Sequence, residues 1–296
     1  MEDILKRIRQ NEIFVADGAM GTMLMKRGLK PGTPPESFNI THPEILENIA
    51  KLYLDAGAEI IQTNTFGASP LKLSFYSLES QTEEINRNAV FAVKKIVNKN
   101  AYISGSCGPS GKLLKPYGDT GTEIIYNSFK KQINALISAG VNIICAETMT
   151  DLTEITLAVK AAKSISSSIP VMATMTFDPT PKGFYTIMGV NIEKAAKGLE
   201  DAGADIIGSN CGNGIENMVK IAKKFKEVSK LPIIIQSNAG VPEIKNGKTL
   251  YPETPDFMAE KAKELVSIGV SIIGGCCGTT PEHIRAIREM VDRMKQ

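Results

Sequence analysis

Short runs of consecutive apolar residues alternate along the chain with longer segments in which apolar residues recur every three or four positions. The longer segments, such as MVKIAKKFKEV from Met218, have the period of amphipathic helices that bury one face. The short runs lack polar alternation, which is typical of parallel strands covered on both faces. The pattern therefore predicts strands and helices in alternation around a buried parallel sheet.

Four of these transitions share nearly the same phrase, in which a glycine ends a helix and an isoleucine pair begins a strand. Glycine adopts the left-handed conformation of a helix C-terminus without a steric penalty, and paired isoleucines suit a buried strand. The spacing of the copies corresponds to about two strand–helix units each. The phrases are AGAEII from Ala56, AGVNII from Ala139, AGADII from Ala202 and IGVSII from Ile268.

Completing the intervening segments yields eight strand candidates in a chain of 296 residues. Eight strand–helix units of this length fit a closed (β/α)8 TIM barrel better than an open doubly wound sheet. No Pro- or Ser-rich linker divides the chain, so we expect a single α/β domain over residues 1–296. The candidates are IFVAD from Ile13, EIIQT from Glu59, AYISGS from Ala101, NIICAE from Asn142, PVMATMT from Pro170, DIIGSN from Asp205, PIIIQSN from Pro232 and SIIGG from Ser271.

Composition and charge mainly exclude classes of protein. The chain has 34 basic and 32 acidic side chains, which leaves no electrostatic footprint for nucleic acid or an anionic membrane surface. No apolar run approaches the ~18 residues of a spanning helix, and the start, MEDILKRIRQNE, lacks the apolar centre of a secretory signal. Five cysteines do not make a secreted disulfide framework in a chain this long. We therefore expect a cytoplasmic protein with reduced thiols.

The strand ends are where a TIM barrel builds its active site. No lysine or histidine stands at any of the eight ends, which counts against Schiff-base chemistry and against imidazole acid–base catalysis. Thiols, carboxylates, hydroxyls and amides stand there instead. In chain order these residues are Asp17, Thr63, Asn64, Cys107, Glu147, Thr176, Asn210, Cys211, Asn238, Cys276 and Cys277.

Three of the cysteines converge on one mouth. Cys276 and Cys277 are adjacent in GGCCG, where the flanking glycines let the strand curl so that both thiols can face one ion. Cys211 ends a neighbouring strand in SNCGNG. Three thiolates with few nitrogen or oxygen ligands nearby favour Zn²⁺, with Cys107 as a candidate fourth ligand. The alternative interpretation is a buried cysteine pair beside a tight turn.

A thiolate-rich zinc site suits a particular chemistry. Three thiolates make zinc a weak electrophile, yet a thiol that joins them loses its proton and stays nucleophilic. Asp17 and Glu147 can hold an ammonium group from opposite sides of the mouth, and the backbone N–H groups of DGAMGT can hold a carboxylate. The alternative is a tight loop with Asp17 as a helix N-cap and Glu147 as an ordinary surface residue. The site would thus activate a small amino-acid thiol for attack on an activated alkyl group.

These motifs resemble those of the homocysteine S-methyltransferases, especially the homocysteine-binding barrel at the N-terminus of cobalamin-dependent methionine synthases. The resemblance covers nearly the whole chain, and its most specific part is GGCCGTTPEHI together with the upstream NCG. The matching segments are DGAMGT from Asp17, FNITHPEIL from Phe38, TNTFGA from Thr63, INRNAV from Ile85, GPSG from Gly108, ET from Glu147, NCG from Asn210, NAG from Asn238, NGKTLYP from Asn246 and GGCCGTTPEHI from Gly274.

The resemblance implies a (β/α)8 barrel that binds one zinc ion and homocysteine and transfers a methyl group to the zinc-bound thiolate, forming methionine. It implies zinc ligands at Cys211, Cys276 and Cys277, with the homocysteine sulfur as the further ligand. The expected homocysteine contacts are Asp17 and Glu147 for the ammonium group and the backbone of Gly18 and Ala19 for the carboxylate.

The methyl donor is expected to come from outside the chain, which stops soon after its eighth predicted barrel helix, whereas methionine synthases continue into folate and cobalamin modules. The motifs are closest to the corrinoid-using branch, which implies a separate methyl-corrinoid protein as donor and partner. One alternative is a small donor, S-methylmethionine or betaine. A betaine site would be expected to use an aromatic cage, and the chain has no tryptophan. Another alternative is a non-catalytic module that binds homocysteine or zinc.

Overall fold

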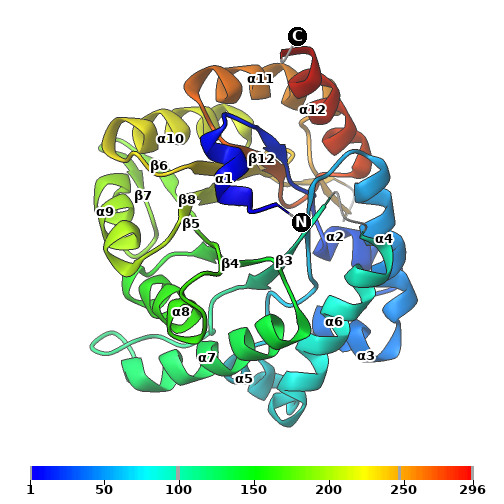
Figure 1. Ribbon diagram of the computed structural model, residues 1–296, viewed down its shortest axis with the longest axis vertical. Coiled ribbons are helices and arrows are strands. Elements are labelled where there is room, and N and C mark those ends of the chain that lie inside the picture. Colours follow the sequence, from blue (N-terminus) through cyan, green and yellow to red (C-terminus); the bar gives the residue numbers. More distant parts are fainter. Residues whose placement is uncertain (1, 98–100, 246–247, 295–296) are drawn as a thin grey trace.

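A closed barrel of eight parallel strands, ringed by helices, forms the centre of the molecule (Figure 1). The computed structural model describes residues 2–97, 101–245 and 248–294, so Asn246 and Gly247 of the NGKTLYP segment lie outside the described residues. The barrel strands are β1 (Phe14–Val15), β2 (Ile60–Gln62), β3 (Tyr102–Cys107), β4 (Ile143–Met149), β5 (Val171–Met175), β8 (Ile206–Asn210), β9 (Ile233–Ser237) and β12 (Ile272–Gly275).

The predicted (β/α)8 barrel is confirmed, and each of the eight strand candidates overlaps one barrel strand, although β3 ends one residue and β4 two residues beyond the candidate. The strands pair in the order β1-β12-β9-β8-β5-β4-β3-β2, and all of these pairings are parallel. A parallel bridge between Ala16 and Ile60 joins β1 to β2 and closes the ring. The carboxyl ends of all eight strands therefore meet at one end of the barrel.

Twelve α-helices are assigned within the described residues, and the long ones cover the outside of the barrel. Gly57, Gly140, Gly203 and Gly269 all have φ between 86° and 95°, as the four repeated phrases predict for helix C-termini. The helices are α1 (Ile4–Arg9), α2 (Gly21–Met25), α3 (Phe38–Thr41), α4 (Pro43–Asp55), α5 (Pro70–Leu73), α6 (Thr82–Ile96), α7 (Thr122–Ala139), α8 (Leu152–Ile165), α9 (Ile192–Ala202), α10 (Ile215–Val228), α11 (Pro255–Ile268) and α12 (Pro281–Met294).

Helix α1, which the sequence analysis did not predict, lies across the centre of the ring in Figure 1. Its Ile4 and Ile8 join a buried cluster that every barrel strand supplies from its inward face. Arg7 places its guanidinium over the ring of Phe14, with 4.6 Å between the guanidinium carbon and the ring centroid. The amino end of the barrel is therefore closed by apolar packing and by one stacked cation.

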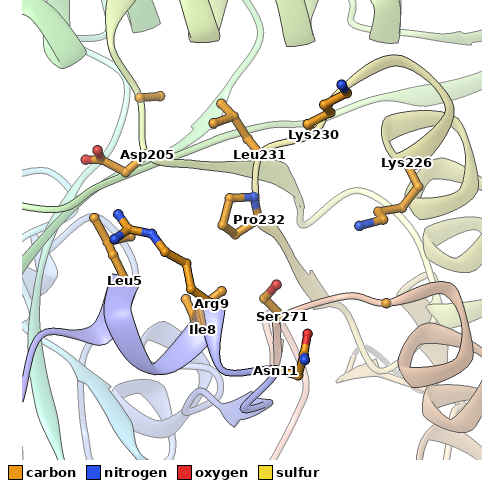
Figure 2. Close-up of a pocket in the computed structure, with 12 residues that line it drawn as sticks. Leu5, Ile8, Arg9, Asn11, Asp205, Lys226, Lys230, Leu231, Pro232 and Ser271 are labelled. Atoms are coloured by element: carbon orange, nitrogen blue, oxygen red, sulfur yellow. The ribbon is translucent and has the colours of Figure 1, made fainter.

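A cavity of about 540 Å³ lies beside α1 at this amino end (Figure 2). Asp205, Pro232 and Ser271 line it, and each directly precedes a barrel strand, so the cavity is at the opposite end from the predicted site. Arg9 and Lys226 also line it, in the last turns of α1 and α10. Cations in a last helical turn offset the partial negative charge of the helix C-terminus, which accounts for their presence.

Two short antiparallel hairpins extend the loops that leave the carboxyl ends of β5 and β9. They pair β6 (Asp178–Thr180) with β7 (Gly183–Tyr185), and β10 (Glu243–Lys245) with β11 (Lys248–Leu250). The sequence analysis predicted neither. Among the described residues, no helix has both the length and the low polarity that crossing a bilayer requires.

Candidate metal and substrate site

Cys211, Cys276 and Cys277 come together at the carboxyl end of the barrel, where β8 and β12 finish. Their three Sγ atoms all lie within 4.8 Å of one another, and Cys211 Sγ is 3.9 Å from Cys277 Sγ. All three side chains are partly accessible, so a small molecule can approach them. The convergence that the sequence predicts for these three thiols is present in the structure.

The backbone around the cluster is shaped to aim the thiols. Cys211 has φ of 61°, a left-handed conformation that a non-glycine residue adopts at a cost of about 1 kcal/mol or more. On β12, a Cβ at Gly274 would lie 2.8 Å from Ala16 Cβ, closer than side chains pack. The end of β12 therefore requires glycine at position 274 for space.

Hydrogen bonds within the cluster distribute its protons unequally. The neighbouring thiols of Cys211 and Cys276 lower the pKa of Cys277 below its usual range, which favours its thiolate form. The same interactions raise the pKa of Cys276 well above its usual range, with burial adding to the effect. The cluster therefore already stabilises negative charge on sulfur.

The donor set fits zinc. A tetrahedral ion with Zn–S bonds of about 2.3 Å holds its sulfur ligands about 3.8 Å apart. The 3.9 Å between Cys211 and Cys277 is close to that separation. Soft thiolate ligands without nearby imidazole favour zinc over magnesium or calcium. Three thiols also leave one tetrahedral position for a ligand from outside.

The other two cysteines lie elsewhere. Cys107 is fully buried in the apolar layer between the strands and the helices, and it is not part of the thiol cluster. Its candidacy as a fourth ligand is therefore wrong for this structure. Cys145 is buried within β4 among the inward-facing residues at the closed end of the barrel.

Asp17 follows β1 and is buried, with 2 % of its surface exposed. The backbone N–H of Gln62 donates to its Oδ2 at 2.8 Å, whereas Oδ1 is buried without any hydrogen-bond partner. Burial raises the pKa of Asp17 to about 8, and the negative charge of Glu147 contributes. The interpretation of Asp17 as a helix N-cap is wrong, because the N-cap position of α2 is Met20. A buried carboxylate oxygen without a partner is instead suited to a cationic ligand.

Glu147 is 6 % exposed, so the interpretation of an ordinary surface residue is wrong for it as well. It lies where the pairing of β4 with β5 shifts register between Ala146 and Met149, an irregularity that re-aims side chains. Ser106 donates a hydrogen bond to its Oε1, and Asn210 donates to its Oε2 at 3.3 Å. Burial raises the pKa of Glu147 to about 7.

Asn210 connects this carboxylate to the thiols, a role that the sequence analysis did not assign to it. Its Nδ2 donates to Thr148 Oγ1 at 2.7 Å and lies 4.0 Å from Cys276 Sγ. Its Oδ1 accepts from the Thr148 N–H at 2.8 Å and from Thr174 Oγ1 at 2.7 Å. Thr148 has φ of 59°, which is rare for a β-branched residue, and Asn210 stabilises that turn. In the sequence, only the position of Asn210 directly before Cys211 indicated that it belongs to the site.

The backbone of Gly18 and Ala19 lies beside the cysteine turn. The Ala19 N–H donates to Thr279 Oγ1 at 3.1 Å, and Tyr53 donates to the Ala19 carbonyl at 2.9 Å. In the described part of the chain, the N–H groups of Gly18 and Met20 make no such hydrogen bond. A carboxylate bound at this turn would therefore use those neighbouring N–H groups, since that of Ala19 is already occupied.

Residues 14–291 match the protein family described as homocysteine S-methyltransferase. The chain is also 30 % identical to a methionine synthase of Mycobacterium leprae and 31 % identical to that of Mycobacterium tuberculosis. These alignments cover 98 % and 99 % of this chain but 25 % and 26 % of the two relatives. The chain thus spans about a quarter of the length of these relatives.

Among solved structures, the fold is similar to that of the homocysteine methyltransferase MmuM from Escherichia coli. The metallated form of that protein superposes with a TM-score of 0.80 over 97 % of this chain and 99 % of that one, at 20 % identity. The oxidised form gives a TM-score of 0.79 at 21 % identity. At such identity the likeness establishes the fold, which agrees with the barrel described above.

Proposed function

Because the chain belongs to the homocysteine S-methyltransferase family, we propose that it is a zinc-dependent enzyme that methylates the sulfur of homocysteine to form methionine. The observation that carries the proposal is the placement of three converging thiols beside two buried carboxylates at one mouth. Thiols suit the metal and the sulfur end of the substrate, and carboxylates suit its ammonium end.

Cys211, Cys276 and Cys277 would hold the zinc ion. Bound there, zinc would offer a position to a substrate thiol and favour its deprotonated, nucleophilic form. Asn210 would hold Cys276 in place through its amide, 4.0 Å from that sulfur. The left-handed turn at Cys211 keeps its thiol directed at the other two.

The amino-acid end of homocysteine would bind around Asp17 and Glu147. An ammonium group can donate to the unpartnered Oδ1 of Asp17 and offset the charge of two carboxylates that burial otherwise keeps partly protonated. The N–H groups next to Ala19 would receive the carboxylate. Glycine at position 18 lets the backbone come this close, because a Cβ there would lie 2.6 Å from Thr279 Oγ1.

The methyl group would come from a methyl-corrinoid held by a separate protein. A methyl-corrinoid would supply an electrophilic methyl group, so that a carbon–sulfur bond would replace the methyl–cobalt bond and the electron pair of that bond would remain with the corrinoid. The thiol proton leaves to solvent. The corrinoid assignment rests on the resemblance of the motifs to the corrinoid-using methionine synthases, and two relatives at 30 % and 31 % identity are methionine synthases.

The test is demethylation of methylcobalamin, followed by its absorbance change, with zinc-loaded protein and homocysteine. We expect turnover that requires homocysteine and that a chelator abolishes. Parallel reactions with S-methylmethionine and with betaine identify the donor by the methionine formed. Turnover with a small donor alone would replace the corrinoid in the proposal. Zinc-loaded protein that binds homocysteine yet forms no methionine from any of the three donors would overturn the enzymatic assignment.

A further inference from the structure

A single buried hydroxyl connects the two halves of the site. Thr279 Oγ1 donates to the carbonyl of Cys276 at 2.7 Å and accepts from the N–H of Ala19 at 3.1 Å. One partner belongs to the turn that carries the thiols, and the other belongs to the turn that follows Asp17. Thr279 is fully buried, so water does not compete for either bond.

Both turns are built around this hydroxyl. A Cβ at Gly18 would lie 2.6 Å from Thr279 Oγ1, and a Cβ at Gly275 would lie 2.3 Å from the same atom. Neither glycine has a positive φ, so each is needed for space and not for backbone conformation. The glycines of DGAMGT and GGCCG thus leave room for the same side chain.

Tyr53 supports the arrangement from α4. Its hydroxyl donates to the carbonyl of Ala19 at 2.9 Å and lies 3.4 Å from the carbonyl of Thr279. Its ring also closes the space over Gly18, where a Cβ would meet Tyr53 Cε1 at 2.9 Å. Tyr53 is 1 % exposed. The turn after Asp17 is therefore held on both its N–H and its carbonyl by buried hydroxyls.

We propose that Thr279, supported by Tyr53, is a positioning residue that sets the separation between the amino-acid end and the sulfur end of the site, and thereby selects homocysteine over cysteine. The inference rests on the proposed function, because it assigns the two ends as described above. Cysteine is shorter by one methylene, and one carbon–carbon bond is about 1.5 Å. One methylene more or less in a fitted pocket changes discrimination by about 10–200-fold, so a fixed separation can distinguish the two ligands.

The test is calorimetric titration of the zinc-loaded protein with L-homocysteine, L-cysteine and L-2-aminobutyrate. The last ligand has the homocysteine skeleton without the thiol, so it reports the amino-acid end alone. We expect wild type to prefer homocysteine to cysteine. In Thr279→Val, which keeps the shape and removes the hydroxyl, we expect that preference to fall about tenfold. The affinity for 2-aminobutyrate and the zinc content should stay within twofold, which a general structural defect would not allow.

Thr279→Ser keeps the hydroxyl and should retain the preference. Thr156→Val removes a threonine hydroxyl on the exposed side of α8 and should behave as wild type. If Thr279→Val does not fold, Tyr53→Phe carries the test, with a smaller loss of preference expected. An unchanged ratio of affinities in a folded, zinc-loaded Thr279→Val or Tyr53→Phe overturns the inference, as does a wild type without preference.

The outcome is separable from that of the proposed function. A wild type that selects homocysteine but never methylates it would contradict the enzymatic assignment and leave the positioning role in place. A wild type that forms methionine while Thr279→Val keeps full discrimination would contradict only the positioning role.

Discussion

The two ends of the barrel use the same eight strands for opposite purposes. At the amino end, apolar side chains from every strand pack against Ile4 and Ile8 of α1. The carboxylate that lines the cavity there, Asp205, accepts from Lys163 Nζ at 2.6 Å and from the Val171 N–H at 2.8 Å. At this end the buried carboxylate is paired and the apolar side chains are packed together, as stability requires.

At the carboxyl end these rules are broken around the thiol cluster. Asp17 is buried with one oxygen unpartnered, Glu147 is buried beside it, and Cys211 and Thr148 have left-handed backbones. Each of these features costs folding free energy, and each faces the thiol cluster or supports a residue that does. The difference between the ends indicates that groups which lower stability are retained where the molecule binds its ligands. We therefore expect comparable substitutions at the two ends to change stability in opposite directions.

The largest expected effect is at the thiol cluster. Cys276→Ser should lose bound zinc and lower homocysteine methylation by at least about 100-fold, because removal of a ligand exceeds the 10–100-fold losses seen for groups behind the ligands. Far-UV circular dichroism should show an intact barrel. Cys107→Ala, outside the cluster, should retain one zinc per chain by metal analysis. Full zinc and activity in Cys276→Ser would remove that residue from the metal site.

At the closed end, Ile4→Ala should act on stability alone. The side chain is 1 % exposed in the inward-facing cluster, so its truncation should lower the free energy of unfolding by about 3 kcal/mol. Urea denaturation measures the loss. The kcat/KM of the folded protein should match wild type, and a large fall in kcat/KM would show that the two ends are coupled.

Matched changes of carboxylate to amide should have opposite signs at the two ends. Burial raises the pKa of Asp17 from 3.8 to about 8, so the folded state binds a proton that the unfolded state releases. Stability is therefore lost as pH rises from about 4 to about 8, and Asp17→Asn, which cannot ionise, should stabilise the ligand-free protein increasingly over that range. The same substitution should weaken homocysteine binding.

Asp205→Asn, which breaks the ion pair with Lys163, should instead lower stability by about 1 kcal/mol. Thermal denaturation at several pH values measures both variants. A destabilised Asp17→Asn at pH 8 would contradict the account of a carboxylate that is strained without its ligand.

For activity, we expect a smaller effect from Glu147→Gln than from loss of a thiol. The amide can still accept from Ser106, but the charge opposite the ammonium group is lost. We expect the KM for homocysteine to rise about tenfold, the equivalent of ~1.4 kcal/mol, with kcat nearly unchanged. Steady-state kinetics with homocysteine as the varied substrate measure it. Unchanged homocysteine kinetics would remove Glu147 from the substrate site.

The sequence by itself determined that there are eight strands, that they are parallel, and that three cysteines converge at one end of the barrel. These features depend on local periodicity and on residues at strand ends, which the barrel geometry then brings to one end. It did not reveal that Cys107 faces the helices, because the direction of a strand side chain depends on which face of the strand turns inward. Tyr102 faces inward and Cys107, five positions on, faces outward.

Only the tertiary structure decided what the site residues do. The burial that raises the pKa values of Asp17 and Glu147 comes from neighbouring strands, and no local pattern encodes it. The contact between Ala19 and Thr279 joins residues 260 positions apart. Nothing in the sequence around Tyr53, which lies in α4, indicates that its hydroxyl contacts the turn after Asp17. Strand periodicity acts over a few residues, whereas closure of the barrel brings its first and last strands together. The separation between the two halves of the site is set at that closure.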